Sequence, residues 1–290
     1  MADVVGLYNL SSCMSLSFKP WLTPLCEPIA NIGDCTDPSG ANWVLLADAH
    51  AQNKQISNYQ NQSIRFAPQQ LNTKQAYELG IAQTGIVTCR TVAARFTSAD
   101  ERHDWYNALM WLQFPRSKAL LNQLQTNAYL AQIANSRPSG SRGTVRDALT
   151  VFDENALILC HDNPRLIDAL RSKQWTAALH ASRDAWGKEI KPFVFGHALL
   201  QKLDQPFKSI TAHAYVIRIT QPDLADLNQT QLDTALCASL KQIDWSEKPF
   251  FPLPVLGIPF WSEHNADIDF YNDPKVFRAS KGQWCDDENR

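Results

Sequence analysis

A dense run of large apolar residues lies between Ser98 and Pro115. At about 100° per residue these side chains surround a helix on nearly every side, and a helix that is apolar all round is buried. Ser98 and Glu101 fit a capping box at its start, and Pro115 cannot continue it. The pattern therefore predicts a buried helix between these bounds. Its large residues are Trp105, Tyr106, Leu109, Met110, Trp111, Leu112 and Phe114.

Three polar residues interrupt this apolar helix. His103, Asp104 and Asn107 fall together within an arc of about 100° on its surface. Polar side chains on a buried helix need partners from protein, water, a metal or a substrate. The arc is therefore a candidate site, and the alternative is a structural hydrogen-bond network that satisfies the same groups.

The spacing of apolar residues elsewhere predicts more helix than strand. Gly80 is expected to close a helix over 73–80, and Thr144 with Asp147 to cap one over 144–149. Proline punctuation excludes a regular helix over 250–261 and predicts an extended arm across the core. Other helices are expected over 18–32, 115–131, 164–170, 175–186, 197–203 and 230–242, and 43–50 fits either helix or strand. Extended segments are expected over 64–68, 156–160, 192–195 and 210–219, and 85–91 fits either a strand or a turn.

This order of elements favours an α+β fold over a doubly wound sheet, because strands are few and unevenly spaced. We expect a mainly helical single domain with a small β-sheet and an extended, proline-containing C-terminal arm. Residues 1–280 would form this domain, and 281–290 a polar tail. The loop at 135–143 is the alternative domain boundary, but the buried helix before it favours one unit.

The composition excludes some classes of protein but does not indicate a function. Hydrophobic residues make up 44% and charged residues 19%, which is typical of a soluble globular protein. The net charge of -2 gives no global attraction to nucleic acid or anionic membrane, and no apolar run is long enough to cross a bilayer. The N-terminus does not resemble a signal peptide, and the seven scattered cysteines contain no CxxC pair. We therefore expect a cytoplasmic protein with reduced thiols.

Two further groups of residues could join the polar arc. Asp153 and Glu154 are expected at a helix-to-strand turn, where they either face a shared cleft or form a solvated turn. His197 begins a helix after Gly196, and His213 lies inside a strand. The two histidines meet if that strand face lines a pocket, and otherwise each is a satisfied core residue.

The loop before residue 147 is a candidate anion site. Arg142 and Arg146 flank a glycine-containing helix start, where free N–H groups and guanidinium suit a phosphate or carboxylate. The alternative is a flexible surface loop with solvated arginines. The loop lacks the Lys-Ser/Thr end of a P-loop, and the chain contains no GxSxG nucleophile motif and no GxGxxG after a strand.

Two resemblances follow from these residues. The His103-Asp104 pair resembles the metal-binding dipeptide of HD-type phosphohydrolases, in which His50 and Asp153 would supply the upstream His and downstream Asp. Residues 21–278 resemble an uncharacterised proteobacterial family known only as a domain of unknown function, which implies a bacterial, cytoplasmic, single-domain protein but no activity. The blocks that carry this likeness are HDxxNxLxWLxFP (103–115), RDALTxFDE (146–154), FGHALL (195–200), ITAH (210–213) and PLPVLG (252–257).

Two hypotheses of function remain. In the first, the chain is an enzyme. Its metal-dependent version is a hydrolase that uses a divalent metal ion to act on a small anionic substrate, either phosphorylated or nucleotide-like. Its expected catalytic residues are His103, Asp104, Asn107, Asp153 and Glu154; its expected metal ligands are His197, His213 and Asp147; its expected substrate contacts are Arg142, Arg146 and Trp111. In the second, the polar cluster is structural, and the chain is a binding or scaffold protein whose 250–261 arm or a neighbouring surface contacts a protein partner.

Overall fold

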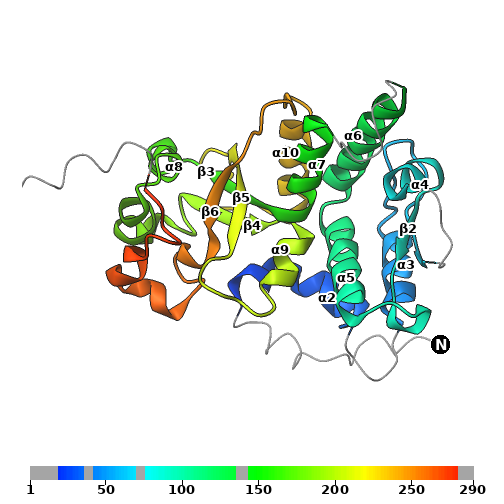
Figure 1. Cartoon of the computed structure of the whole chain (residues 1–290), viewed down its shortest axis with the longest axis horizontal. Coiled ribbons are helices and arrows are strands. Elements are labelled where there is room, and N and C mark those ends of the chain that lie inside the picture. The colour runs from blue at the N-terminus through cyan, green and yellow to red at the C-terminus, as the bar shows by residue number, and fades with distance from the viewer. Residues whose placement is uncertain (1–18, 36–41, 70–75, 135–142, 280–290) are drawn as a thin grey trace, which may run out of the picture.

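The computed structural model describes residues 19–35, 42–69, 76–134 and 143–279 (Figure 1). These residues form an α+β fold in which helices outnumber strands and the strands make two small sheets. The predicted fold class is therefore confirmed. None of the helices within these ranges combines the length and apolarity that a membrane crossing requires. The expected polar tail lies outside the described residues.

The larger sheet has the strand order β4-β3-β5-β6. Its central strand β3 (Ala156–His161) is buried along its whole length, because its apolar side chains alternate onto two covered faces. β3 pairs in parallel with β5 (Thr211–Arg218) and antiparallel with β4 (Ile190–Val194). β6 (Phe251–Pro254) is antiparallel to β5. The strands expected near 156–160, 192–195 and 210–219 are confirmed.

Both edges of this sheet contain proline. Pro192 lies in β4, and Pro252 and Pro254 lie in β6. Proline has no N–H to give to a strand ladder, so it is accommodated on edge strands. The expected extended arm therefore begins as an edge strand and continues as a 3-10 turn over Val255–Gly257.

The smaller sheet pairs β1 (Arg65–Pro68) in parallel with β2 (Ile86–Cys89). The helix between them, α4 (Tyr77–Thr84), ends four residues later than Gly80, where the sequence predicted its end. The stop is Gly85, which adopts the left-handed conformation (φ +73°) that terminates helices. Gly80 remains inside the helix.

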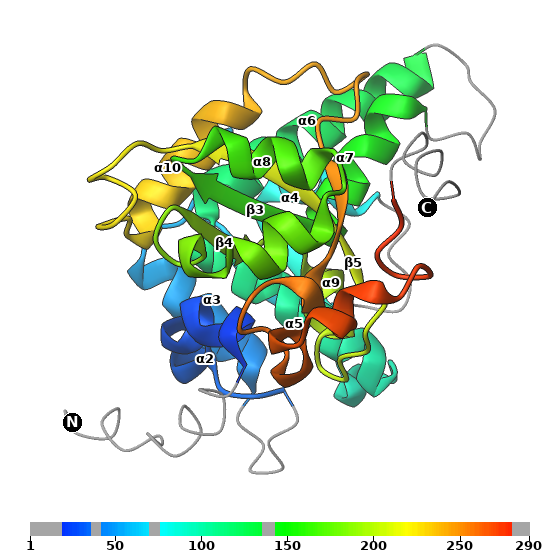
Figure 2. The same cartoon turned by 90° about the vertical axis from the view of Figure 1, so that its left-hand side faces the viewer.

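The other helical elements surround these sheets (Figure 1). In Figure 2 the blue N-terminal helices lie beneath β3 and β4. In chain order these elements are η1 (Pro20–Leu25), α2 (Cys26–Ile32), α3 (Trp43–Asn53), η2 (Val92–Ala94), α5 (Ser98–Gln113), α6 (Pro115–Ala134), α7 (Thr144–Asn155), α8 (Pro164–Arg171), the π-helix η3 (Thr176–Ala181), η4 (Arg183–Ala185), α9 (His197–Lys202), α10 (Gln229–Leu240), η6 (Glu263–Ala266) and η7 (Ile268–Asn272). The single helix expected over 175–186 is thus two irregular turns.

Helix α5 is the buried helix that the sequence predicts. Every residue from Asp104 to Gln113 is buried, and α5 packs between α9 and α3 (Figure 1). Its capping box is shifted by one residue from the prediction: Thr97 is the N-cap, and Asp100 is its reciprocal partner. The carboxylate of Glu101 instead accepts a hydrogen bond from the indole of Trp43 (3.1 Å), which ties α5 to α3.

Helix α7 is longer than predicted, and this changes the setting of two candidate residues. It continues from Thr144 to Asn155, so Asp153 and Glu154 lie in its last helical turn rather than in a turn after it. Its N-cap is Gly143 (φ +75°), with no side-chain cap, so the expected Thr144–Asp147 capping box is wrong. Two acidic residues therefore lie at the end of α7 where the helix dipole is negative.

Gly196 allows the start of α9 to meet the end of α7. A Cβ at this position would lie 2.6 Å from both the Cα and the N of Asn155, closer than real Cβ atoms approach backbone. We expect Gly196→Ala to lower the free energy of unfolding by about 1–3 kcal/mol, because backbone must shift to admit the methyl group. Chemical denaturation measures this change. Gly187→Asn is the control without a clash, because a Cβ there meets nothing within 4 Å and only the strain of the positive φ of 86°, which asparagine adopts more readily than most residues, remains. A loss at Gly196 no larger than at Gly187 would contradict the steric argument.

Candidate functional site

A cavity of about 370 Å³ opens where α4, β2, α5, α6, α7 and α9 meet. Its volume lies in the range of small-molecule sites. Six of the residues predicted from the sequence line it: His103, Asp104, Asn107, Asp153, Glu154 and His197. The other lining residues are Gln69, Tyr77, Glu78, Thr88, Arg90, Gln125 and Thr150.

Two histidine rings meet at the wall of this cavity. The Nε2 atoms of His103 and His197 lie 3.2 Å apart, and the rings pack edge to face. The amide oxygen of Gln201 lies 3.1 Å from His103 Nδ1, while its amide nitrogen donates to the carbonyl of Ala99. This orientation of Gln201 makes His103 Nδ1 the hydrogen donor, because an amide oxygen only accepts.

The contact between the two rings ties the tautomer of His197 to that of His103. At 3.2 Å the Nε2 atoms are within hydrogen-bonding distance, so a hydrogen bond between them needs a hydrogen on one of the two. His197 Nδ1 is buried without a well-directed partner in the described ranges, although the nearby backbone of Asp153 favours a hydrogen there.

Burial keeps His197 itself uncharged. Its side chain is 5% exposed, and this burial lowers the pKa of His197 to about 3 despite the nearby Asp153 carboxylate. His197 therefore meets His103 at the cavity wall as a neutral ring.

A chain of hydrogen bonds runs behind the other wall. The buried ammonium of Lys118 donates to Asp153 (2.5 Å) and to the Asn107 side-chain oxygen (2.9 Å). Asn107 in turn donates to the hydroxyl oxygen of Tyr77 (2.8 Å). Burial by itself raises the pKa of Asp153, but the charge and hydrogen bond of Lys118 outweigh it and leave that pKa lowered. Asp153 therefore stays ionised as the partner of Lys118.

The end of this chain is a phenol that can donate into the cavity. Although 41% of Tyr77 is exposed, its hydroxyl end is enclosed, and this burial, with nearby Cys89 and Asp104, raises its pKa well above the ordinary value. The hydroxyl therefore keeps its hydrogen. Because the oxygen already accepts from Asn107, the O–H remains available to a bound molecule.

Asp104 is fully occupied by one arginine. The Arg90 guanidinium lies 2.7 Å and 3.0 Å from its two carboxylate oxygens, and the Arg90 backbone N–H donates at 2.6 Å. A further nitrogen of Arg90 donates to Asp100 (2.6 Å). This bidentate arrangement fixes the end of β2 on α5. It leaves Asp104 little capacity to bind another group.

Four polar side chains of the cavity form no hydrogen bond within the described part of the chain: Gln69, Thr88, Gln125 and Glu154. Gln125 is only 7% exposed, and Glu154 is half-buried in the last turn of α7. Gln69 and Thr88 are half-buried as well. These four side chains are therefore free to form hydrogen bonds with a bound molecule.

The remaining sequence candidates lie outside the cavity lining. His213 packs edge to face on Phe250, and Asp147 is exposed in the first turn of α7. Trp111 is buried behind Lys118, 5.7 Å from its ammonium, and Arg146 lies 3.9 Å from Glu78. Arg142 lies outside the described residues. His197, His213 and Asp147 are thus not brought together, and no group of three His, Cys, Asp or Glu side chains in the described ranges is arranged to hold a metal ion.

Several residues in or beside the cavity were not predicted from the sequence, among them Lys118, Tyr77, Arg90, Gln125 and Gln201. Lys118 lies in the helix that the sequence predicts over 115–131, where a lysine is ordinarily expected on the solvated face. Tyr77 and Arg90 come from the smaller sheet and its helix, whose position against α5 no local pattern predicts.

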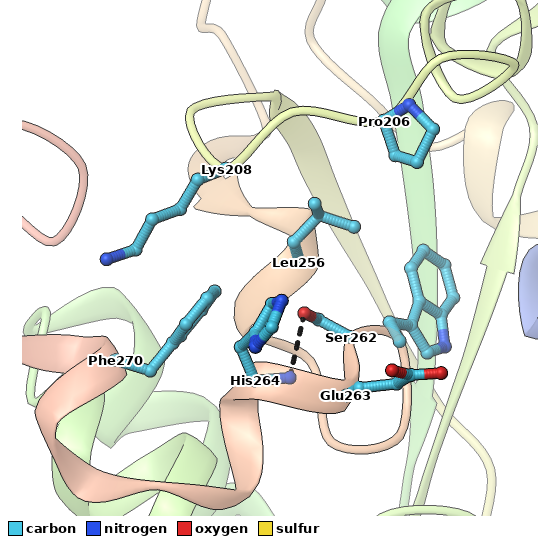
Figure 3. A pocket seen from close by; sticks show the side chains of 8 residues that line it. Pro206, Lys208, Leu256, Ser262, Glu263, His264 and Phe270 are labelled. Carbon is cyan, nitrogen blue, oxygen red and sulfur yellow. Dashed lines mark hydrogen bonds between the residues drawn. The ribbon is translucent and has the colours of Figure 1, made fainter.

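A second cavity is larger but less suited to chemistry. It measures about 510 Å³ and lies beside η6 (Figure 3). His264 and Glu263 are exposed there, and Figure 3 shows Ser262 turned back to accept from the His264 backbone N–H (3.3 Å). Lys208 lies over the ring of Phe270. Its histidine and glutamate reach solvent, whereas the first cavity has buried titratable groups, so the first is the stronger candidate despite its smaller size.

Comparison with known families places this site in context. The sequence matches the family described as protein of unknown function (DUF3025) over residues 64–281. The chain belongs to the DUF3025 family. This confirms the resemblance drawn from the five sequence blocks. No curated protein and no solved structure matches the chain. Every residue that lines the first cavity of this DUF3025 protein falls within the matched range.

The ion pair of Lys118 and Asp153 supports a first test of the site. Their side chains are 4% and 16% exposed. Lys118→Met in this DUF3025 protein should lower the free energy of unfolding by about 3–5 kcal/mol, because a buried carboxylate loses its counter-charge. Lys118→Met combined with Asp153→Leu should recover most of that loss in urea denaturation. A double variant no more stable than the single one would contradict the pairing.

The buried His197 predicts a pH effect on stability. The folded protein keeps His197 neutral down to about pH 3, whereas the unfolded chain protonates it near pH 6.5. Between these values the unfolded state binds the extra proton, so the free energy of unfolding falls as the pH falls. His197→Gln should flatten this fall by at most about 1.4 kcal/mol per pH unit, measured by denaturation between pH 6 and pH 4. Parallel pH profiles of the two proteins would contradict the assignment.

Proposed function

We propose that this chain is an enzyme that performs general acid–base chemistry, such as hydrolysis, on a small polar substrate in the first cavity. The observation that carries the proposal is the His103–His197 pair, whose Nε2 atoms lie 3.2 Å apart at the cavity wall. Imidazole is the common acid–base group near neutral pH.

In this proposal the cavity residues have different tasks. His103 exchanges a proton with the substrate or with a water, and His197 and Gln201 hold its ring in position. The free O–H of Tyr77 donates to negative charge that develops during the reaction. Asp104 and Asp153, which the sequence suggested as catalytic, act through Arg90 and Lys118 to hold the walls together.

Two features bear on the metal-dependent version. The carboxylates of Asp104 and Asp153 each already have a resident cation within 2.7 Å. The histidines and acids expected to bind the metal lie in separate parts of the described chain. The proposal therefore uses Lys118 and Arg90 where the metal version would use a divalent ion.

The test is a comparison of His103→Gln with the unmodified protein on a panel of small esters, amides, alkylguanidines and alkyl phosphates, with products followed by NMR. We expect turnover of at least one class, and a loss of about 100-fold or more in the variant, which is typical of removing an acid–base group. His264→Gln is the matched control, since this exposed histidine lines the second cavity. Equal turnover by His103→Gln and the unmodified protein would contradict the proposal.

The same panel separates the other hypotheses. Turnover should be unchanged after treatment with a chelator, and loss of activity that is restored by one divalent metal would support the metal-dependent version. Binding of a panel compound in the cavity without turnover of any class would instead support a binding protein.

A further inference from the structure

The acidic groups around the cavity differ in how they are compensated. Asp104 is paired with Arg90, Asp153 with Lys118, and Glu78 more loosely with Arg146 at 3.9 Å. Within the described part of the chain Glu154 forms no ion pair and no hydrogen bond. Its carboxyl group is therefore the acidic group of the cavity lining left without a partner.

The position of Glu154 makes this lack of a partner costly to the fold. It lies in the last turn of α7, where the helix dipole presents its negative end. Asp153, its neighbour in the same turn, is held by the buried ammonium of Lys118. An acidic residue here without a cation opposes the dipole. A cation bound beside Glu154 would offset this unfavourable interaction.

An independent observation on another helix also indicates a ligand. Gln125 of α6 is 93% buried, since its exposed fraction is 7%, and it lines the cavity without a side-chain hydrogen bond to any described residue. Its neighbours Asn122 and Thr126 both donate to the backbone carbonyl of Glu78. Gln125 therefore differs from the residues around it, and its amide oxygen can accept from a bound N–H group.

We propose that the cavity binds a substrate that carries a positively charged nitrogen group, an alkylammonium or alkylguanidinium. Its N–H groups donate to the Glu154 carboxylate, and the Gln125 amide oxygen accepts from a polar hydrogen of the same substrate. Arg90 and Lys118 do not repel this group strongly, because each is already paired with a carboxylate. The inference deepens the proposed function and rests on it, since it takes this cavity as the substrate site.

The experiment measures binding rather than turnover. Butylguanidinium, butylammonium, butyramide and butyl phosphate are titrated into the full chain and followed by calorimetry at low salt. We expect at least one of the two cations to bind about tenfold or more tightly than the amide and the phosphate, because a hydrogen bond between two charged partners is the strong kind. Tighter binding of butyl phosphate, or failure of both cations to bind at millimolar concentration, overturns the inference.

Two variants in the same helix make the test specific. Glu154→Gln should weaken binding of the cation by about tenfold or more. Asp147→Asn removes the same charge from the exposed first turn of α7, outside the cavity, and should leave binding within about twofold, because a solvated charge at a distance is screened. Glu154→Gln should also keep or raise the melting temperature, so that weaker binding cannot be ascribed to unfolding. Equal binding by Glu154→Gln and the unmodified protein overturns the inference.

Failure of this inference can be told apart from failure of the proposed function. If cation binding depends on Glu154 but the protein turns over no panel compound, the inference is supported and the proposed enzymatic function is contradicted. Turnover that depends on His103, with a preference for butyl phosphate over the cations, keeps the enzyme and overturns the inference.

Discussion

One buried ammonium group holds the walls of the candidate site together. Lys118 lies on α6, and its Nζ atom donates to Asp153 on α7 and to Asn107 on α5. A lysine that is 4% exposed is stable only because both contacts compensate its lost hydration. A single charge therefore links three of the helices that line the cavity.

The charge of Lys118 also reaches groups that it does not touch. Asn107 cannot turn its amide around without losing the bond from Lys118, so its nitrogen must point at Tyr77. The tyrosine oxygen is then an acceptor, and its hydrogen is directed elsewhere. The ion pair of Lys118 and Asp153 thus helps to decide that the Tyr77 hydroxyl is a hydrogen-bond donor towards the cavity. Such networks usually act as units rather than as independent pairs.

The sequence was most informative where periodicity and burial agree. The apolar pattern of 98–115 predicted both the buried helix and the polar arc on it, and three residues of that arc do line the cavity. The strand at 156–160 was equally clear, because it is apolar on both faces. Element ends were less predictable: α7 continues through Asp153 and Glu154, since no proline or glycine stops it before Asn155.

Contacts between residues far apart in the chain could not be predicted from the sequence. Nothing local indicates that Gln201 would orient His103, nearly a hundred residues away, or that His213 would pack on Phe250 rather than approach His197. These contacts depend on how α9 and β5 are placed by the four-stranded sheet. The cavity is formed by α4, β2, α5, α6, α7 and α9, so its composition follows from tertiary packing rather than from any one motif.

The prolines of the larger sheet have a consequence for the behaviour of the protein in concentrated solution. A strand at the edge of a sheet presents unpaired N–H and C=O groups that can recruit a strand from another molecule. Pro192 in β4 and both prolines of β6 remove donors from such a row, at the two ends of the sheet order. The paired strands β3 and β5 keep an unbroken ladder between them. The two edges of the sheet are therefore poor templates for a strand from another molecule. This protects the protein against aggregation through edge-to-edge pairing.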